Sequence, residues 1–298
     1  MNAIVGLPWR AGALLLLATL ALLAASPAAS QAACANPVAC ENALPGSPSD
    51  DWYVPGAGDA SIAGFATSMS TNVGDTVNFK IKSATSNYRI DIYRLGWYGG
   101  DGARLIQSNV PHTGTGAQPA CASQASTGLV DCGTWSASAS WAIPSTAVSG
   151  VYIAHLKRND TGGENQIVFV VRDDASHSAI AVQTSDATWE AYNAYTDAEG
   201  RQSLYLCTDL CPPGNPRAYK GAFKVSYNRP FTTAHDSPGS WLFTGAEYSM
   251  IRFLEANGYD VSYLSSADVN SRGSLLLNHK LFMSSGHDEY WSAGQRST

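Results

Sequence analysis

Residues 164–186 read ENQIVFVVRDDASHSAIAVQTSD, and the structural pattern of the chain changes inside this stretch. Its first half, ENQIVFVVRDD (164–174), is the last of a series of predicted β-strands. Its second half, SAIAVQTSD (178–186), predicts a buried strand that runs directly into TWEAYNAY (188–195). The chain therefore passes near residue 176 from one kind of sheet to another.

Several short segments upstream show the alternation of apolar and polar residues that is typical of β-strands. They are TVNFKIKS (76–83), YRIDIYRL (88–95), SASWAIP (138–144) and SGVYIAHLK (149–157). Turn signals recur between them, as at Pro144 and Gly150. Short strands separated by turns at this spacing predict an antiparallel, immunoglobulin-like β-sandwich.

The glycine-rich stretch GWYGGDGARL (96–105) lies between segments that resemble strands. Glycine-rich loops cradle phosphate groups where a strand turns into a helix. Because strands are expected on both sides here, a hairpin or a bulged loop is the preferred interpretation.

After residue 176 the predicted strands alternate with a helix. GAEYSMIRFLEANG (245–258) has apolar residues at helical spacing, and Gly258 is suited to end the helix. YDVSYLS (259–265) and LNHKLFMSSG (277–286) follow as predicted strands. This order predicts a parallel α/β sheet. The expected fold class is therefore mixed, with an antiparallel sandwich first and an α/β domain second.

Composition excludes some classes of function. Hydrophobic residues make up 45% of the 298 residues and charged residues 14%, which is typical of a folded globular protein. The formal net charge is −6, and the sequence has no run of lysine or arginine. Nucleic-acid binding requires a basic patch, so no nucleic acid is expected as a partner.

The first residues have the layout of a secretory signal peptide. Arg10 precedes the apolar segment AGALLLLATLALLAA (11–25), and small residues suited to cleavage follow. The apolar segment is short for a membrane span, which needs roughly 20 residues, and an uncleaved anchor is the alternative. We expect a secreted, cell-envelope or periplasmic protein. The expected organisation is a signal peptide (1–32), a linker (33–50), the β-sandwich (51–174) and the α/β domain (175–298).

Cysteine usage agrees with export. The six cysteines form three pairs of near neighbours: Cys34 with Cys40, Cys121 with Cys132, and Cys207 with Cys211. We expect three local disulfides, each closing a loop in an oxidising compartment. A zinc site is the alternative, and it is disfavoured because no C-x-x-C pair occurs.

The segment SGHDEYWS (285–292) follows the last predicted strand and is rich in reactive side chains. In open parallel sheets, ligands bind at the carboxyl ends of the strands, and Gly286 allows a sharp backbone turn there. His287, Asp288 and Glu289 can act as general acids and bases or as ligands of a hard metal ion. The alternative is that Asp288 caps a turn and its neighbours face solvent.

The final residues begin with an S-x-x-Q capping box, Ser292 and Gln295, which predicts the start of a helix. So short a helix is marginal on its own, and a parallel sheet needs helices on its faces. We therefore expect this sequence to be a fragment of a longer protein, with low solubility.

Four segments together make the chain resemble the N,N-dimethylformamidase large-subunit family. They are YRLGWYGGDGAR (93–104), TWEAYNAY (188–195), VSYNRPF (225–231) and SGHDEYWS (285–292), in the family's order. The resemblance implies a β-sandwich followed by an α/β domain related to glutamine amidotransferases. It also implies hydrolysis of a small amide at a mononuclear iron held by two tyrosines and one glutamate.

Carried onto this sequence, the resemblance implies that Glu289 is the glutamate ligand and that His287 is the acid/base beside it. Tyr192 is the first tyrosine ligand, and Tyr227 is the preferred second. Phenolate and carboxylate oxygens suit ferric iron, and His287 can carry a proton to the leaving amine. A second subunit or a homo-oligomer is also implied.

Alternatives stay open at two levels. Tyr205 and Tyr219 are alternatives to Tyr227 as the second ligand. For the whole protein, the alternative is a non-catalytic secreted module that binds a glycan, because 8 tryptophans and 14 tyrosines can supply surfaces that stack on sugar rings. A serine hydrolase is disfavoured because the sequence has no G-x-S-x-G motif.

Overall fold

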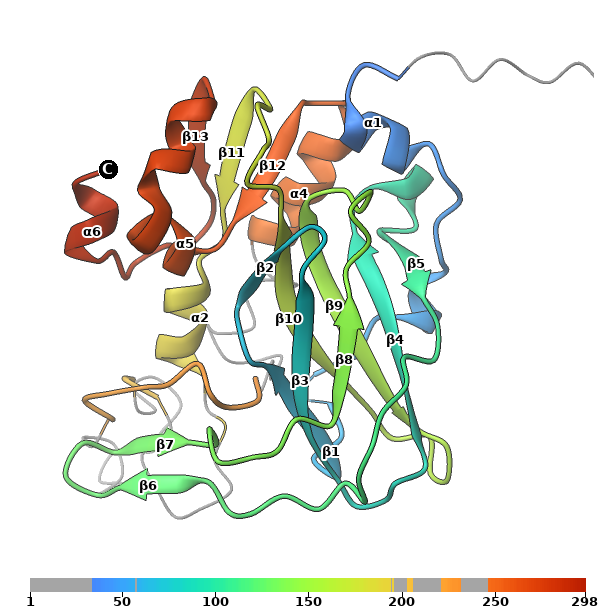
Figure 1. Ribbon diagram of the computed structural model, residues 1–298, viewed down its shortest axis with the longest axis vertical. Helices are drawn as coiled ribbons and strands as arrows, with labels where there is room; N and C mark the ends of the chain where they lie inside the picture. Colours follow the sequence, from blue (N-terminus) through green and yellow to red (C-terminus); the bar gives the residue numbers. More distant parts are fainter. Residues whose placement is uncertain (1–33, 57, 194, 196–202, 206–220, 232–245) are drawn as a thin grey trace, which may run out of the picture. The chain divides into compact units, whose positions relative to one another are not determined.

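Two β-sheets form the first part of the fold in the computed structural model of this chain (Figure 1). The structure describes residues 34–298 except for 57, 194, 196–202, 206–220 and 232–245. The smaller sheet is antiparallel, with the order β1 (Ile62–Ala66), β3 (Thr76–Ser83), β8 (Ala139–Ala142). The larger sheet has the order β2 (Ser70–Asn72), β10 (Glu164–Arg172), β9 (Gly150–Arg158), β4 (Tyr88–Leu95), β5 (Ala103–Gln107). Its β2–β10 pair is parallel and its other pairs are antiparallel.

The two sheets pack on one another through the apolar side chains that alternate along their strands. In β3 every second residue from Val77 onward is buried. Phe79 and Ile81 of this strand meet Ile92 and Phe169 of the larger sheet in one apolar cluster. The alternation seen in the sequence therefore marks the faces that meet between the two sheets.

The larger sheet is covered on its other face as well. β9 and β10 are buried along nearly their whole length, which explains their strongly apolar sequences. On this second face, Val151, Ile153 and Val168 pack with Val182 and Tyr263 from the second part of the fold. One sheet thus contributes to two apolar cores.

The second part of the fold is a three-stranded parallel sheet. Its order is β12 (Val261–Leu264), β11 (Ile180–Gln183), β13 (Leu281–Ser284). The helix α2 (Asp186–Tyr192) follows β11, and α4 (Ala246–Ala256) precedes β12. The mixed fold, with a parallel α/β part after the antiparallel strands, has the expected order. Likeness to immunoglobulin domains and to glutamine amidotransferases stays a prediction.

The strand predicted over 277–286 begins only at Leu281, so the prediction was wrong over its first residues. A helix and a 3₁₀ helix precede it, α5 (Ser266–Arg272) and η4 (Gly273–Asn278). Ser265 and Asp268 form a capping box that starts α5. Leu275 and Leu276 of η4 pack beside the buried Val269, whereas Leu277 is exposed, so this apolar run forms a helical turn.

Residues 34–50 were expected to be a linker, and that expectation was wrong. They include the helix α1 (Pro37–Asn42), which is capped by the Asn36 side chain, and the 3₁₀ helix η1 (Ser49–Asp51). The Cys34–Cys40 disulfide ties the segment that leads into α1. The Asn36 side chain also donates to the carbonyl of Gly258 at 2.9 Å, so α1 is anchored to the second part of the fold.

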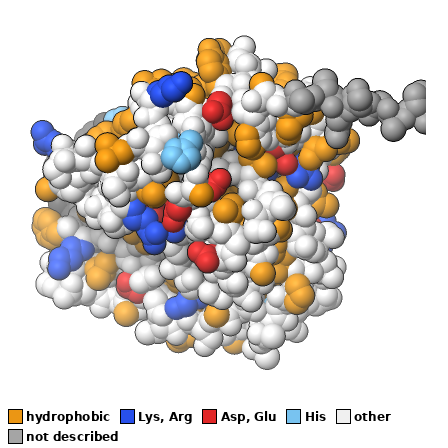
Figure 2. All heavy atoms as spheres, turned by 45° about the horizontal axis from the view of Figure 1, so that its top comes forward, with side chains coloured by type: hydrophobic (Ala, Val, Ile, Leu, Met, Phe, Trp, Pro, Cys, Tyr) orange, Lys and Arg blue, Asp and Glu red, His pale blue; other side chains and the backbone are white. Residues whose placement is uncertain are grey.

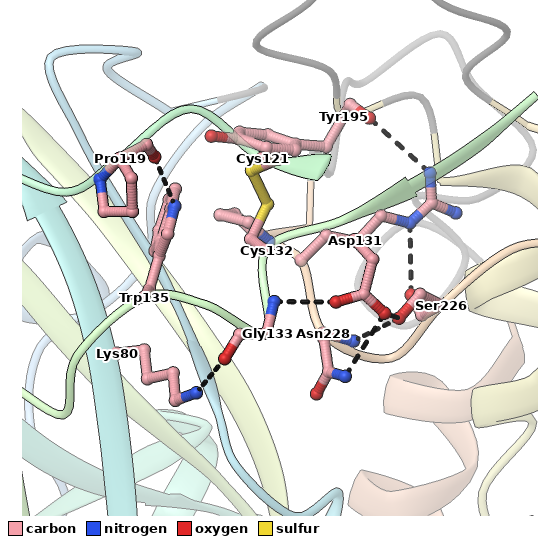
Figure 3. The surroundings of a disulfide bond; sticks show 12 residues. Lys80, Pro119, Cys121, Asp131, Cys132, Gly133, Trp135, Tyr195, Ser226 and Asn228 are labelled. Atoms are coloured by element: carbon pink, nitrogen blue, oxygen red, sulfur yellow. Dashed lines mark hydrogen bonds between the residues drawn. A yellow bond between two sulfur atoms is a disulfide. The ribbon is translucent and has the colours of Figure 1, made fainter. Parts of the chain in front are cut away.

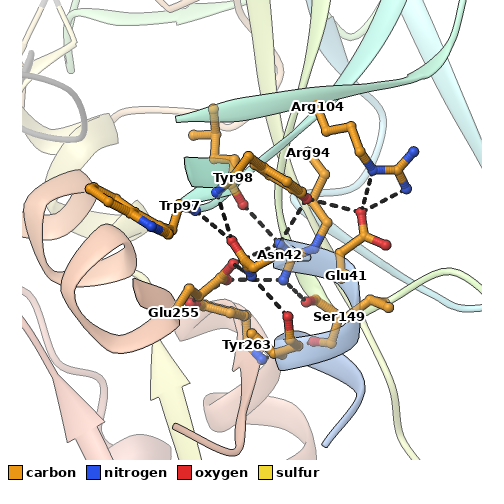
Figure 4. Close-up of polar contacts among 12 residues, drawn as sticks. Glu41, Asn42, Arg94, Trp97, Tyr98, Arg104, Ser149, Glu255 and Tyr263 are labelled. Carbon is orange, nitrogen blue, oxygen red and sulfur yellow. Dashed lines mark hydrogen bonds and ion pairs between the residues drawn. The ribbon is translucent and has the colours of Figure 1, made fainter. Parts of the chain in front are cut away.

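A buried ion pair joins the two parts of the fold beside α1 (Figure 4). Arg94 of β4 and Glu255 of α4 are fully buried, with Nη1 2.8 Å from Oε2. Glu255 also accepts hydrogen bonds from Asn42 of α1 and Tyr263 of β12. Removing one partner would leave a buried charge uncompensated, so this pair holds α1, β4 and α4 in one arrangement.

The glycine-rich stretch connects the antiparallel neighbours β4 and β5, as the hairpin interpretation predicted. Its turn contains a short 3₁₀ helix, η2 (Tyr98–Gly100). Gly102 has a positive φ of 84°, and a Cβ at this position would collide with the hydroxyl of Tyr248 on α4. Glycine is therefore required here for both backbone conformation and space.

Two of the three expected disulfides, Cys34–Cys40 and Cys121–Cys132, are formed. The third pair, Cys207 and Cys211, and the predicted signal peptide lie outside the described residues. Within the described part of the chain, no helix has the length and apolar character needed to cross a membrane. On the face shown in Figure 2, lysine and arginine side chains are scattered, and aspartate or glutamate side chains lie among them.

Candidate functional site

The candidate site lies at the carboxyl edge of the parallel sheet, where the neighbours β11 and β13 end. The chain passes from β11 to β12 on one side and then to β13 on the other, so the strand order reverses at β11. In open parallel sheets, ligands bind in the crevice at such a reversal. Helix α2 leaves the carboxyl end of β11 (Figure 1), and residues 285–291 leave that of β13.

A fully buried carboxylate fixes the start of α2. Asp186 accepts the backbone N–H of Ser266 at 2.6 Å and the hydroxyl of Thr184 at 2.8 Å. It also accepts the hydroxyl of Tyr227 at 2.9 Å. Burial raises the pKa of Asp186, and these hydrogen bonds oppose that change. The carboxylate therefore links α2 to α5 and to the segment that contains Tyr227.

A second buried carboxylate supports the first turn of α2 from α4. Glu247 accepts the backbone N–H of Ser185 at 2.8 Å and the indole N–H of Trp189 at 2.5 Å. Burial raises the pKa of Glu247 to about 7, although both hydrogen bonds act in the opposite direction. Through Trp189 this carboxylate fixes the rotation of α2 about its axis.

The segment after β13 is held against α2 and β11. Gly286 turns the chain at a positive φ of 75°. Asp288 then accepts a hydrogen bond from Nε2 of Gln183 in β11 at 2.6 Å. The backbone N–H of Glu289 donates to the hydroxyl of Thr188 in α2 at 2.9 Å. Asp288 is therefore an anchor of this segment, and it leaves Glu289 beside the end of α2.

Four side chains meet around Glu289. Its Oε2 accepts the hydroxyl of Tyr192 at 2.9 Å and lies 2.7 Å from Nε2 of His287. Its Oε1 accepts the hydroxyl of Tyr205 at 2.6 Å. The rings of Tyr192 and Tyr205 are stacked, with centroids 4.2 Å apart. The hydroxyl of Tyr205 also contacts that of Tyr290.

Opposing effects set the charge of this cluster. Burial raises the pKa of Glu289, but hydrogen bonds from Tyr205, Tyr192 and His287 lower it below the usual value. Burial and the bonded carboxylate raise the pKa of Tyr205 well above its usual range. Burial also raises the pKa of Tyr192. At neutral pH the cluster is a carboxylate between two protonated phenols, and oxygen donors of this kind suit hard cations.

The structure brings together three of the four predicted site residues: Tyr192, His287 and Glu289. It does not bring Tyr227 to them, because that hydroxyl binds Asp186. Tyr205, which the sequence left as an alternative, is the second tyrosine on Glu289. Tyr219 lies outside the described residues. No local pattern distinguishes Tyr205 in the sequence, since its contact with Glu289 spans 84 positions.

The strap, residues 226–231, holds the end of α2 from which Tyr192 projects. Arg229 is buried, with Nε 3.3 Å from Oε2 of Glu190, and its Nη2 donates to the backbone carbonyl of Glu190 at 2.7 Å. Asn193 donates to Glu190 at 3.3 Å and to the carbonyl of Pro230 at 2.9 Å. The strap therefore fixes the backbone on both sides of Tyr192.

A disulfide-closed hairpin of the first part of the fold supports the strap (Figure 3). The strands β6 (Ala122–Gln124) and β7 (Leu129–Asp131) form this hairpin, and Cys121–Cys132 closes it. The backbone N–H of Cys132 donates to the carbonyl of Asn228 at 2.6 Å. Asp131 accepts the hydroxyl of Ser226 at 2.7 Å. A continuous series of contacts thus runs from the disulfide through the strap to α2.

A pocket with a volume of about 410 Å³ lies beside the cluster. It is bounded by residues from the beginnings of α2, α5 and α6 (Ala293–Arg296). Tyr227, Tyr290 and Trp291 give it aromatic walls, and none of the described side chains that line it is charged. Tyr290 belongs both to this pocket and to the cluster around Glu289.

The cluster around Glu289 differs from the commonest metal sites of proteins, which are built from His, Cys, Asp and Glu. Across the described ranges, no three His, Cys, Asp or Glu side chains are grouped in a way that could hold a metal ion. The oxygen donors around Glu289 include two phenols, which are less common ligands.

Comparisons with known proteins place most of the chain in one family. A family model described as N,N-dimethylformamidase beta subunit-like, C-terminal, matches residues 89–298. No curated protein has a significant match to the chain. A solved structure of a family 123 glycoside hydrolase from Clostridium perfringens is 12% identical, with a TM-score of 0.17. That alignment covers 45% of this chain and only 32% of the glycosidase, and so slight a likeness decides neither fold nor activity.

Proposed function

Because the chain belongs to the N,N-dimethylformamidase beta subunit-like family, we propose that it hydrolyses the C–N bond of a small amide to an acid and an amine. The observation that best supports this is the convergence of two phenols on one carboxylate. The hydroxyls of Tyr192 and Tyr205 bind the two different oxygens of Glu289, at 2.9 and 2.6 Å. Three hard oxygen donors therefore point to one place at the carboxyl edge of a parallel sheet, where ligands bind.

The donor set fits a ferric ion, which favours phenolate and carboxylate oxygens. Tyr192, Tyr205 and Glu289 would hold it. When bound, such an ion polarises an amide carbonyl and lowers the pKa of a water molecule. Burial raises the pKa values of both phenols, so each would release its proton on becoming a ligand.

The chain's own residues supply the proton transfer. Nε2 of His287 lies 2.7 Å from Glu289 and 3.4 Å from the hydroxyl of Tyr192, at the edge of the cluster. An imidazole there can accept a proton from the attacking water and deliver it to the amine nitrogen as the C–N bond breaks. Thr188 keeps Glu289 and His287 in register with α2 through its bond to the Glu289 backbone.

We place this activity outside the cytoplasm, in the periplasm or in the medium. The two disulfides support export, because such bonds persist in oxidising compartments. The signal-like residues at the start of the sequence agree with it.

The test compares the purified protein with Glu289→Gln for metal content and visible absorption after loading with ferric iron. We expect near-stoichiometric iron with a tyrosinate charge-transfer band in the parent protein and neither in the variant. Glu164→Gln is the matched control. It changes an ion pair with Lys157 in the β-sandwich strands, remote in sequence from Glu289, and it should keep both the iron and the absorption band. Amine release from small amides is then measured. Iron binding that is equal in all three proteins would refute the assignment of Glu289.

A further inference from the structure

The pocket beside the cluster has no place yet in the proposed chemistry. From its lining we infer that it binds the apolar, aromatic-sized substituent of a neutral amide, so that the substrate is bulkier than a formamide. This inference rests on the proposed function, because it assigns a substrate class to that same site. It makes a separate claim about binding, which can be measured without catalysis.

The lining selects against charge. Among the described side chains around the pocket there is no Asp, Glu, Lys, Arg or His. Moving a charged ligand group from water into this pocket costs desolvation energy, and no side chain of opposite charge is present among the described lining residues to compensate for it. The pocket therefore favours a neutral ligand over a carboxylate or an ammonium ion of the same shape.

Three aromatic side chains give the pocket its shape. Tyr227 is fixed by its bond to Asp186, and Trp291 packs edge-on against Phe282 with centroids 5.9 Å apart. Tyr290 forms a third wall, and its hydroxyl contacts that of Tyr205. Rings held in this way offer flat surfaces for another ring at little conformational cost. A mostly apolar lining suits an aromatic or branched aliphatic group better than a polyhydroxylated sugar.

One lining residue can recognise the amide itself. Oδ1 of Asn270 accepts the hydroxyl of Ser292 at 2.6 Å. The side-chain N–H groups of Asn270 have no hydrogen-bond partner among the described residues, and the side chain is exposed. They can donate to a carbonyl oxygen of a ligand in the pocket. Ser292 thereby fixes which end of the Asn270 amide faces the ligand.

The pocket connects directly to the cluster. Tyr290 lines the pocket, and its hydroxyl contacts that of Tyr205, which donates to Glu289. A ligand that fills the pocket therefore lies against Tyr290, which is linked through Tyr205 to the residues proposed to cleave the amide. The volume of about 410 Å³ gives room for a substituent larger than a methyl group. Dimethylformamide would leave most of it empty.

The experiment is isothermal titration calorimetry of the metal-free full chain with N-benzylacetamide, N,N-dimethylformamide, benzoate, benzylammonium and glucose. We expect N-benzylacetamide to bind at least about tenfold more tightly than the other four. Asn270→Ala should weaken that binding about 5- to 10-fold, the value of one hydrogen bond. Asn257→Ala is the matched control, because Asn257 is exposed just after α4 and, among the described residues, its side chain bonds only the Phe253 carbonyl.

Each outcome decides the inference. Equal binding of the charged ligands, preferential binding of glucose, or no difference between Asn270→Ala and Asn257→Ala would overturn it. Repeating the titration with Glu289→Gln separates the two proposals. If N-benzylacetamide still binds to this variant, the pocket assignment stands. If the iron-loaded parent hydrolyses no amide, the proposed reaction is refuted independently of the pocket.

Discussion

The phenol ring of Tyr192 lies flat against that of Tyr205, with centroids 4.2 Å apart and an interplanar angle of 13°. The two hydroxyls thereby reach different oxygens of the same carboxylate. This stacking brings the end of α2 together with a residue 13 positions farther along the chain. It also identifies Tyr205, and not Tyr227, as the partner of Tyr192.

Two matched substitutions separate the candidate second ligands. Tyr205→Phe removes a hydroxyl from Glu289, whereas Tyr227→Phe removes one from Asp186. We expect Tyr205→Phe to lower ferric-ion affinity at least about tenfold and to weaken the tyrosinate band. Tyr227→Phe should keep both and instead lower stability by about 1–3 kcal/mol, since it removes a hydrogen bond from a buried carboxylate. The opposite result would restore Tyr227 as the ligand.

The buried Arg229–Glu190 pair should dominate the stability of the strap. Arg229→Met leaves Glu190 buried without its charge partner, at a cost of about 3–5 kcal/mol. Arg272→Met removes a largely exposed ion pair with Asp174, which keeps Arg172 as a partner, and should cost at most about 1 kcal/mol. Urea unfolding of both variants gives the comparison. Adding Glu190→Gln to Arg229→Met should recover much of the loss, and no recovery would mean that packing, not charge, sets the cost.

The two disulfides should differ in their effect on the site although they contribute similarly to stability. Their loops span 11 and 6 residues, so each stabilises the fold by about 2–3 kcal/mol in the chain-entropy account. Replacing Cys121 and Cys132 with serine should loosen the strap and reduce metal affinity. Replacing Cys34 and Cys40 should lower thermal stability and leave metal affinity unchanged. Equal losses of affinity in both double variants would mean that the hairpin has no special link to α2.

Glu247 predicts a pH dependence of stability. Its pKa is raised by burial from an ordinary 4.5 to about 7, so between these values the folded chain binds more protons than the unfolded chain. The contribution is complete below about pH 4.5 and is lost as the pH rises through 7, by up to about 3 kcal/mol. Glu247→Gln cannot titrate. The difference in unfolding free energy between parent and variant should therefore change steadily from pH 4.5 to 7 and stay constant above that.

The sequence predicted those features that depend on local periodicity. β3 alternates because one face of the strand enters the core between the sheets, and the segments that become β9 and β10 are apolar because both their faces are covered. The cluster at His287 and Glu289 could be located because it follows a strand. The strap could not be predicted, since Arg229 and Glu190 are 39 positions apart and no local pattern joins them. α5 was missed because its capping box ends in an aspartate and its helix is short.

The doubly covered sheet has a consequence for how this protein can vary. The strands β9 and β10 present Ile153 and Val168 to the second part of the fold, and Ile167 and Phe169 to the smaller sheet. Suppose that recombination replaced the chain after residue 174 with an unrelated α/β segment. The apolar surface of that segment would not be complementary in shape to these strands. The two parts are therefore not interchangeable modules. A substitution in β9 or β10 must be compatible with the packing on both faces of the larger sheet.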